Sequence, residues 1–137
     1  MMRIVVDTGP LVAYLNRGDR WHRWSASQMA ALRPPLLTCE PVLTEACFLI
    51  QRAGGRPEDL IRKVVQGHLE VGVDIQDDAS AIQSLMQRYA DTPMSLADAC
   101  LVRLTEVIPD CRLFTLDEDF EHYRRNGRQL IPLLRPA

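Results

Sequence analysis

Four acidic side chains lie in apolar stretches of the sequence, and they are the residues whose types and spacing most directly indicate chemistry. Asp7 follows the apolar run at residues 4–6, and Asp117 follows the mostly apolar run at residues 113–116. Glu45 is the only charged residue in residues 41–50, and Asp98 is the only charged residue in residues 94–102. An ionised carboxylate beside apolar side chains is costly unless a cation or several hydrogen-bond donors compensate it.

Each acid taken alone has a structural alternative, because an isolated carboxylate can cap a helix or accept hydrogen bonds from backbone amides. Four such acids together favour a shared site. Carboxylates about 4 Å apart repel each other by roughly 4 kcal/mol at an effective dielectric constant near 20. The only lysine of the chain, Lys63, is distant in sequence from all four acids. A divalent cation is then the natural partner, and oxygen ligands favour Mg²⁺ or Mn²⁺ over zinc.

Strands that alternate with helices must position these acids. We expect strands at residues 3–6, 36–38, 69–73, 112–115 and 129–131. We expect helices at residues 10–15, 20–32, 41–53, 57–68, 79–89 and 95–107, and a short helical piece at residues 118–126. The alternation predicts an α/β fold in which helices cover both faces of a parallel sheet. In such folds the ligand site lies beyond the carboxyl ends of the strands.

Two of the expected helices carry a capping signal at their amino-terminal ends. Ser95 and Asp98 have the spacing of a capping box, with Asp in place of the usual Glu or Gln. Asp77 or Asp78 is expected to cap the helix at residues 79–89. Asp98 therefore has both a structural and a functional interpretation.

The length and composition indicate one compact domain over residues 1–137. The chain has 137 residues, of which 47% are hydrophobic and 25% are charged, as is common in soluble globular proteins. No apolar run approaches the ~20 residues that cross a bilayer, and the amino terminus lacks the layout of a signal peptide. We therefore expect a cytoplasmic protein without a membrane association. The net charge of -2 argues against a general polyanion-binding surface, so contact with a nucleic acid would be local or would depend on a metal ion.

The tripeptide at residues 7–9, Asp-Thr-Gly, is also the active-site tripeptide of aspartic proteases. In those enzymes it lies in a turn of an all-β fold, and two such carboxylates share a proton. Here Pro10 and the apolar residues 11–15 follow, which indicates a helix. A protease is therefore disfavoured. A phosphotransfer site of the D-x-D type is disfavoured as well, because Gly9 occupies the place of its second Asp.

The acids and their neighbours resemble the PIN domain family, and specifically its small VapC-type members. The matching stretches are VVDTGPLVAYL around Asp7, TEACFLI with Glu45, SLADA with Asp98, and LFTLDEDF with Asp117. Each stretch alone is a weak signal. Their order and spacing extend the resemblance over essentially the whole chain.

The resemblance implies a three-layer α/β/α sandwich and a Mg²⁺- or Mn²⁺-dependent endoribonuclease. It also implies a toxin restrained by a small antitoxin protein, and a homodimer. By this likeness Asp7, Glu45, Asp98 and Asp117 would be the catalytic and metal-binding acids. Asp7 and Asp98 would hold the metal directly, while Glu45 and Asp117 would hold it through water or orient the nucleophile.

The resemblance gives supporting roles to Thr8 and Thr115, the stretch TLDEDF itself leaves two roles open for Asp119, and two other functions stay open. Thr8 and Thr115 would hydrogen-bond to the acidic pocket. Asp119 would either be an outer or second-metal ligand or cap the piece that contains Phe120. The alternative functions are an RNA-processing nuclease without an antitoxin and a catalytically silent binding module.

Basic and aromatic residues outside these stretches have two interpretations each. Trp21 and Trp24 share one helix face and could stack on a base, although packing between helices is favoured. Two basic groups could follow an RNA backbone, although ordinary solvated surface is favoured. The groups are Arg52, Arg56, Arg62 and Lys63, and Arg124, Arg125 and Arg128.

Overall fold

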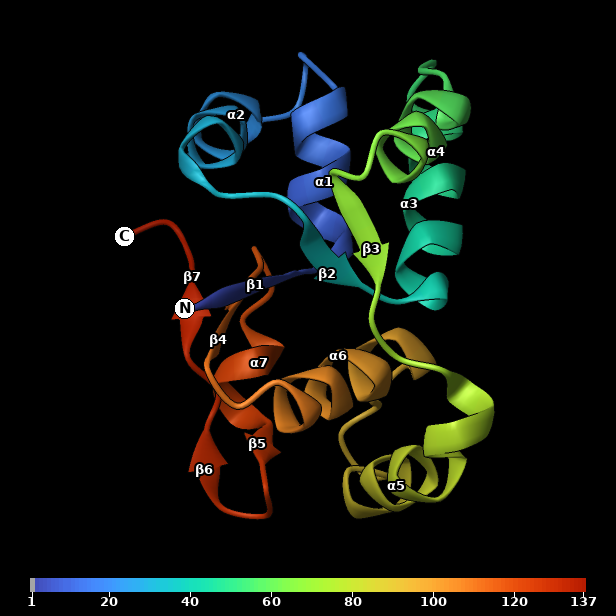
Figure 1. The fold of residues 1–137 in the computed structure, drawn as a ribbon, viewed down its shortest axis with the longest axis vertical. Coiled ribbons are helices and arrows are strands. Elements are labelled where there is room, and N and C mark those ends of the chain that lie inside the picture. Colours follow the sequence, from blue (N-terminus) through green and yellow to red (C-terminus); the bar gives the residue numbers. More distant parts are fainter. Residues whose placement is uncertain (1) are drawn as a thin grey trace.

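The structure is a computed structural model that describes residues 2–137, and its centre is a five-stranded sheet (Figure 1). The strands of this sheet are β1 (Arg3–Val6), β2 (Leu36–Thr38), β3 (Leu69–Val71), β4 (Cys111–Phe114) and β7 (Leu133–Leu134). The helices are α1 (Thr8–Leu15), α2 (His22–Ala31), α3 (Glu40–Arg52), α4 (Pro57–Val65), α5 (Ile75–Arg88), α6 (Leu96–Val107) and α7 (Asp119–His122). A separate hairpin consists of β5 (Arg124–Arg125) and β6 (Gln129–Leu130).

The sheet is parallel, and β1 is its central strand. The strand order is β3-β2-β1-β4-β7, and every neighbouring pair is parallel. The β1 residues Ile4, Val5 and Val6 are buried, as expected for an apolar strand covered on both faces. The chain leaves β1 toward β2 and β3 and later returns to the other side of β1 as β4. The crevice that binds ligands in such sheets is therefore expected at the carboxyl ends of β1 and β4.

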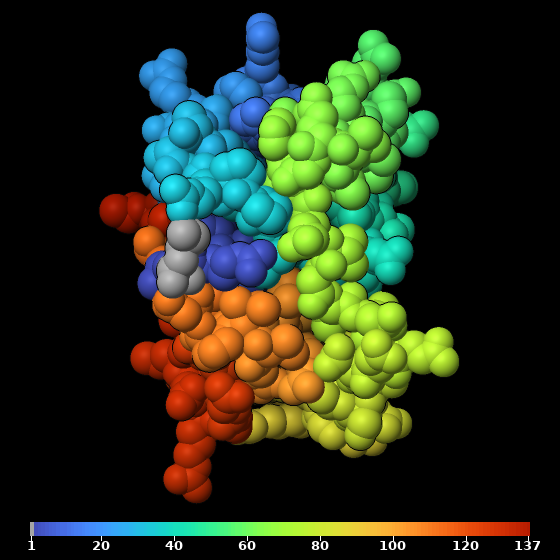
Figure 2. Space-filling model, viewed as in Figure 1, coloured from blue at the N-terminus to red at the C-terminus, as the bar shows by residue number. Residues whose placement is uncertain are grey.

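The helices cover the sheet on both faces, which confirms the predicted three-layer α/β/α fold. Helices α1 to α4 lie on one face, and α5, α6 and α7 lie on the other (Figure 1). The space-filling view shows the same division, with the amino-terminal half from blue to green above and the carboxyl-terminal half from yellow to red below (Figure 2).

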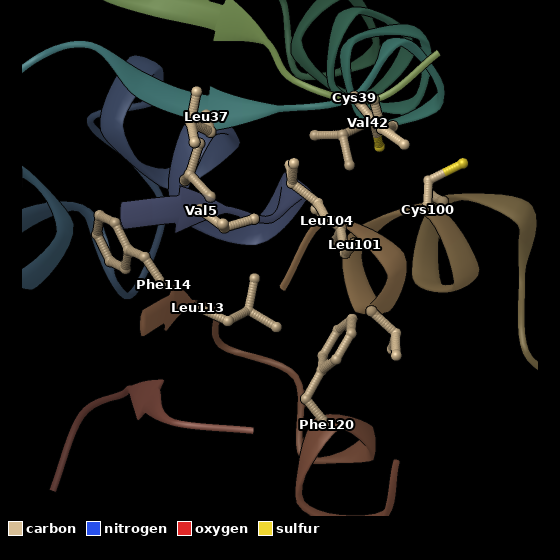
Figure 3. Packing of buried hydrophobic residues seen from close by; sticks show 14 of the residues in the cluster. Val5, Leu37, Cys39, Val42, Cys100, Leu101, Leu104, Leu113, Phe114 and Phe120 are labelled. Carbon is tan, nitrogen blue, oxygen red and sulfur yellow. The ribbon is translucent and has the colours of Figure 1, made fainter. Parts of the chain in front are cut away.

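The core between the layers is formed by side chains of the sheet and of α3 and α6 (Figure 3). Val5, Leu113 and Phe114 from the strands are fully buried. Leu101 and Leu104 from α6 are also fully buried. Burying one such side chain contributes about 1.5 to 3 kcal/mol relative to leaving it in water. This packing holds α6, and with it Asp98, against β1 and β4.

The start of α5 differs from the sequence prediction. The helix begins at Ile75 rather than at residue 79, and its cap is Asp74, whose Oδ1 accepts a hydrogen bond of 2.9 Å from the Gln76 amide. The prediction that Asp77 or Asp78 caps the helix was wrong. Both acids lie in the first turn instead, where the partial positive charge of the helix end favours carboxylates.

The carboxyl-terminal region also differs from the prediction. The expected helical piece at residues 118–126 ends at His122, and the expected strand at residues 129–131 pairs with β5 rather than joining the main sheet. The strand at the edge of the main sheet next to β4 is β7 instead. The cause is the turn between β5 and β6, where Asn126 and Gly127 have φ angles of 52° and 84°. An Asn-Gly pair is a hairpin signal, and it was present in the sequence.

Candidate functional site

A cavity of about 500 Å³ lies at the carboxyl ends of β1 and β4, and acidic side chains dominate its lining. The structure brings all four predicted acids to this cavity. Asp7 follows β1, Glu45 lies on α3, Asp98 lies on α6, and Asp117 follows β4. The cavity is lined by Asp7, Thr8, Gly9, Glu45, Leu49, Asp98, Leu116, Asp117, Glu118 and Asp119. Among these described lining residues there is no Lys, Arg or His.

Asp7 is the most enclosed of the four acids, with a side chain that is 7% exposed. It caps α1, because its Oδ1 accepts a hydrogen bond of 2.7 Å from the Thr8 amide. Its Oδ2 accepts a hydrogen bond of 2.8 Å from the Thr115 hydroxyl. Burial nevertheless raises the pKa of Asp7 to about 6, and the nearby Asp98 and Asp117 carboxylates add to the rise while the hydrogen bonds oppose it. The cavity therefore disfavours the negative charge that a metal ligand needs.

Thr115 connects the ends of the two central strands. The strands are in register, with Val6 opposite Phe114, so the next residue of each strand lies at the same edge. The buried Thr115 hydroxyl donates to Asp7 and accepts a hydrogen bond of 2.9 Å from the Asp117 amide. One hydroxyl thus orients two of the acidic segments.

Thr8 is placed differently from Thr115. Its hydroxyl is buried and has no hydrogen-bond partner among the described residues. Buried hydroxyls are normally paired, so an unpaired one at a cavity indicates room for a water molecule or a ligand atom. The Thr8 hydroxyl is therefore available to whatever occupies the cavity.

Asp98 has the capping role that the sequence predicted, and it also lines the cavity. The Ser95 hydroxyl accepts a hydrogen bond of 3.0 Å from the Asp98 amide, and the Ser95 amide donates to Asp98 Oδ2 at 3.3 Å. These two bonds form the capping box of α6. Burial raises the pKa of Asp98, and the charge of Asp117 adds to the rise. The structural and the functional interpretations of Asp98 are therefore compatible.

Replacing Ser95 with Ala is expected to lower the free energy of unfolding by about 1 kcal/mol, because the cap of α6 is lost. The Ser95 backbone amide still donates to Asp98 in this variant, so the carboxylate keeps a partner. Chemical denaturation measures the change. Ser84→Ala, at an exposed position within α5, is the matched control and is expected to leave the free energy of unfolding unchanged or to raise it slightly, because alanine has the higher helix propensity. A Ser95→Ala protein as stable as this control would contradict the capping assignment.

Glu45 faces the cavity rather than the core. The apolar neighbours of Glu45 in the sequence led us to expect a costly carboxylate among buried side chains, and Val42, Ala46 and Ile50 of α3 are indeed buried. Glu45 itself is exposed, and it lines the cavity together with Leu49 one turn further along. The expectation of a costly buried carboxylate at Glu45 was therefore wrong. Val42, Ala46 and Ile50 face the core from another side of the helix, whereas Phe48 is exposed.

The segment after β4 brings three consecutive acids, Asp117, Glu118 and Asp119, to the cavity. The Asp117 Oδ1 atom accepts a hydrogen bond of 2.9 Å from the Asp119 amide at the start of α7. The suggestion that Asp119 caps the piece containing Phe120 was therefore wrong, because Asp117 accepts that bond. The exposed Asp119 side chain lines the cavity, so the alternative of an outer or second-metal ligand stays a prediction.

Tyr123 is a contact of the site that the sequence analysis missed. Its hydroxyl donates a hydrogen bond of 3.2 Å to Asp98 Oδ2. Burial raises the pKa of Tyr123, and the charges of Asp98 and Asp119 raise it further, so the phenol keeps its proton and acts as a donor. Nothing in the spacing of residues 118–126 indicates this contact. The predicted helix to residue 126 would also have placed Tyr123 differently.

The carboxylates have the oxygen donors that a divalent ion prefers, although these donors do not converge on one position. Among residues 2–137, no three His, Cys, Asp or Glu side chains are placed so that they could hold one ion together. The donors that line the cavity are oxygens, which Mg²⁺ and Mn²⁺ prefer. Burial raises the pKa of Asp7, and the Asp98 and Asp117 carboxylates add to the rise, so a cation in the cavity would favour the ionised form that binds metal. The residues therefore fit a divalent ion, provided that the side chains move toward it.

Several of the basic residues, and Trp24, have structural contacts outside the cavity. Arg56 and Arg62 pair with Glu58 and Asp59 of α4 at 3.8 and 3.3 Å. The guanidinium of Arg124 donates to backbone carbonyls of residues 121–123. The ring of Trp24 packs edge-on against Phe114, with 5.5 Å between the ring centroids. These contacts agree with the structural interpretations of Arg56, Arg62, Arg124 and Trp24. Trp21 precedes α2, where Arg20 stacks over its ring, so the two tryptophans do not both lie within the helix.

Comparison with known proteins identifies the fold. The sequence model of the PIN domain matches residues 4–126. The structure of VapC20 from Mycobacterium tuberculosis, described as a sarcin-ricin loop cleaving toxin, superposes with a TM-score of 0.71 and 23% sequence identity. This match covers 87% of the present chain and 93% of VapC20, and at this identity it shows a shared fold. No curated protein sequence matches the chain. No helix in residues 2–137 is long and apolar enough to span a bilayer.

Proposed function

Because this chain belongs to the PIN domain family, we propose that it is a divalent-metal-dependent endoribonuclease that hydrolyses RNA phosphodiester bonds. The observation that carries the proposal is the cavity itself. Acids from four separate segments line it, and its described lining contains no basic side chain. Such a concentration of negative charge raises the free energy of the protein unless a cation neutralises it. We further propose that residues 1–137 form one domain.

In this proposal Asp7 and Asp98 hold Mg²⁺ or Mn²⁺ directly, and Glu45 and Asp117 hold it through water or orient the attacking water. When bound, such an ion lowers the pKa of water and offsets the charge that develops on the phosphodiester. The protein orients the carboxylates through the hydrogen bonds from Thr115 to Asp7 and from Ser95 and Tyr123 to Asp98. A carboxylate that is not engaged with the ion can accept the proton of the attacking water.

The cavity charge also affects the binding of RNA. The carboxylates repel phosphate groups, so RNA is expected to bind at the cavity only after the charge is neutralised. The affinity for RNA, and not only the rate of cleavage, should therefore depend on the divalent ion. Gel-shift binding of the wild type to an RNA analogue that cannot be cleaved, with and without Mn²⁺, can separate binding from cleavage.

We propose that the protein is the toxin of a toxin–antitoxin pair, that it forms a homodimer and acts on RNA in the cytoplasm. The fold shared with VapC20 supports this interpretation. An RNA-processing PIN nuclease without an antitoxin is the alternative. A neighbouring small open reading frame that encodes a DNA-binding protein would favour the toxin, and its absence would favour the processing enzyme.

The test is inducible expression of the wild type and Asp98→Asn, with sequencing of new RNA 5′ ends. We expect new ends and growth arrest with the wild type alone. The purified wild type should cleave the same RNA with Mn²⁺ and lose this activity in excess EDTA. Glu58→Gln, at an exposed position of α4 outside the cavity, is the matched control and should cleave normally. Undiminished cleavage in EDTA, or by Asp98→Asn, would contradict the proposal and favour contamination or a silent binding module.

A further inference from the structure

We propose that Tyr123 is a positioning residue that orients Asp98 for binding the divalent ion. The inference rests on the proposed function, because it assigns Asp98 to the ion. Its basis is the hydrogen bond of 3.2 Å from the Tyr123 hydroxyl to Asp98 Oδ2. The contact joins residues 25 positions apart and connects the segment after β4 to α6.

The Tyr123 side chain is held by packing, so the position of its hydroxyl is set before any ligand binds. Tyr123 is fully buried. Its ring packs edge-to-face with Tyr89 and Phe120, with ring centroids 5.1 and 5.4 Å apart. Such aromatic pairs contribute beyond their buried area and prefer defined orientations. The ring therefore has little freedom to follow a moving carboxylate.

The hydrogen bonds of Asp98 are concentrated on one of its two oxygens. Oδ2 accepts from the Tyr123 hydroxyl and from the Ser95 amide, at 3.2 and 3.3 Å. Oδ1 is then the oxygen available to a ligand in the cavity. A carboxylate that is fixed through one oxygen loses less side-chain entropy when the other oxygen binds an ion. Groups that orient a metal ligand in this way typically affect metal affinity by about 10- to 100-fold.

The contact is more than a way to satisfy a buried hydroxyl. The capping box already gives Asp98 a backbone partner, so α6 does not need Tyr123 for its cap. A phenylalanine at position 123 would preserve the ring packing and would avoid burying a polar group. What the hydroxyl adds is its contact with a carboxylate of the cavity.

The experiment measures Mn²⁺ affinity by isothermal titration calorimetry for the wild type, Tyr123→Phe and Tyr89→Phe. Tyr89 belongs to the same aromatic cluster, and its hydroxyl accepts a hydrogen bond of 2.9 Å from the Arg124 amide. Both variants keep their rings, so both are expected to fold, and thermal unfolding verifies this. We expect Tyr123→Phe to bind Mn²⁺ about 10- to 100-fold more weakly and Tyr89→Phe to bind like the wild type. RNA cleavage by Tyr123→Phe should recover when Mn²⁺ is raised to saturation.

A double-mutant cycle with Asp98→Asn gives a second readout that does not need activity. If Tyr123 acts through Asp98, removing its hydroxyl should change Mn²⁺ affinity little in the Asp98→Asn background. Equal weakening by Tyr123→Phe and Tyr89→Phe would overturn the inference, and so would an affinity of Tyr123→Phe within twofold of the wild type. A wild type that binds no Mn²⁺ would overturn it as well. Binding of Mn²⁺ with the predicted Tyr123 effect but without RNA cleavage would contradict the ribonuclease proposal alone.

Discussion

Asp7→Asn is expected to make the metal-free protein more stable at pH 8 and to lower RNA cleavage by roughly three orders of magnitude. The wild type buries a carboxylate whose pKa is raised from 3.8 to about 6, so its ionisation opposes folding. A rise of about two pKa units corresponds to roughly 3 kcal/mol, which is the upper limit of the gain. The asparagine oxygen can still cap α1 through the Thr8 amide.

The pH dependence of this effect has a defined sign. Because the folded-state pKa of Asp7 lies above the unfolded value, its contribution to stability is fully present below pH 4 and is lost as the pH rises through 6. Wild type and Asp7→Asn should therefore differ least near pH 3.5 and most above pH 7. Thermal unfolding in EDTA at several pH values measures this difference. A constant difference across the range would show that the charge of Asp7 is not the cause.

Adding the divalent ion should reverse the order of stability. An ion that binds the folded state stabilises the wild type by mass action, and the stabilisation grows with the ion concentration. Asp7→Asn lacks a proposed ligand and should respond much less. RNA cleavage by the variant should fall by roughly three orders of magnitude, as expected when a catalytic group is removed. A variant that gains as much stability from Mn²⁺ as the wild type would contradict the assignment of Asp7 to the ion.

Thr115→Val is expected to be the most destabilising conservative change at the site. Valine has nearly the shape of threonine, but it removes the donor to Asp7 and the acceptor for the Asp117 amide. Because the Asp7 carboxylate loses a donor and the Asp117 amide loses its acceptor, the free energy of unfolding should fall by roughly 2 to 4 kcal/mol. The Thr115 bond opposes the rise in the Asp7 pKa that burial causes, so the loss should be larger at pH 8 than at pH 4. Weaker orientation of two acids should lower Mn²⁺ affinity about 10- to 100-fold.

Thr38→Val provides the matched control for this prediction. Thr38 is also fully buried, and its hydroxyl donates a hydrogen bond of 2.9 Å to the Val6 carbonyl. This control should destabilise the protein without a comparable pH dependence and without a large change in Mn²⁺ affinity. Denaturation at pH 4 and pH 8, together with calorimetry, separates the two variants. Identical behaviour of Thr115→Val and Thr38→Val would mean that Thr115 acts only in packing.

Features that depend on neighbouring residues could be predicted without the structure. The order of strands and helices follows from local hydrophobic patterns, and the acids at the ends of β1 and β4 follow from their positions beside those strands. The capping box of Ser95 and Asp98 is a contact between residues three positions apart, so its spacing was sufficient to predict it. Local patterns also predicted the acids of the site, because an isolated charged residue in an apolar stretch can be recognised from the sequence.

Which side chains meet across the sheet could not be predicted from local patterns, because these contacts join distant parts of the chain. The Thr115 hydroxyl and Asp7 are 108 positions apart, and Tyr123 and Asp98 are 25 apart. The structure also decided that Glu45 faces the cavity and that β6 belongs to a hairpin instead of the main sheet. Such outcomes depend on strand order, on the turn at residues 126–127 and on core packing. Hydrophobic periodicity says which face of an element is buried, but not which distant element covers it, and the contacts that orient the acids depend on that choice.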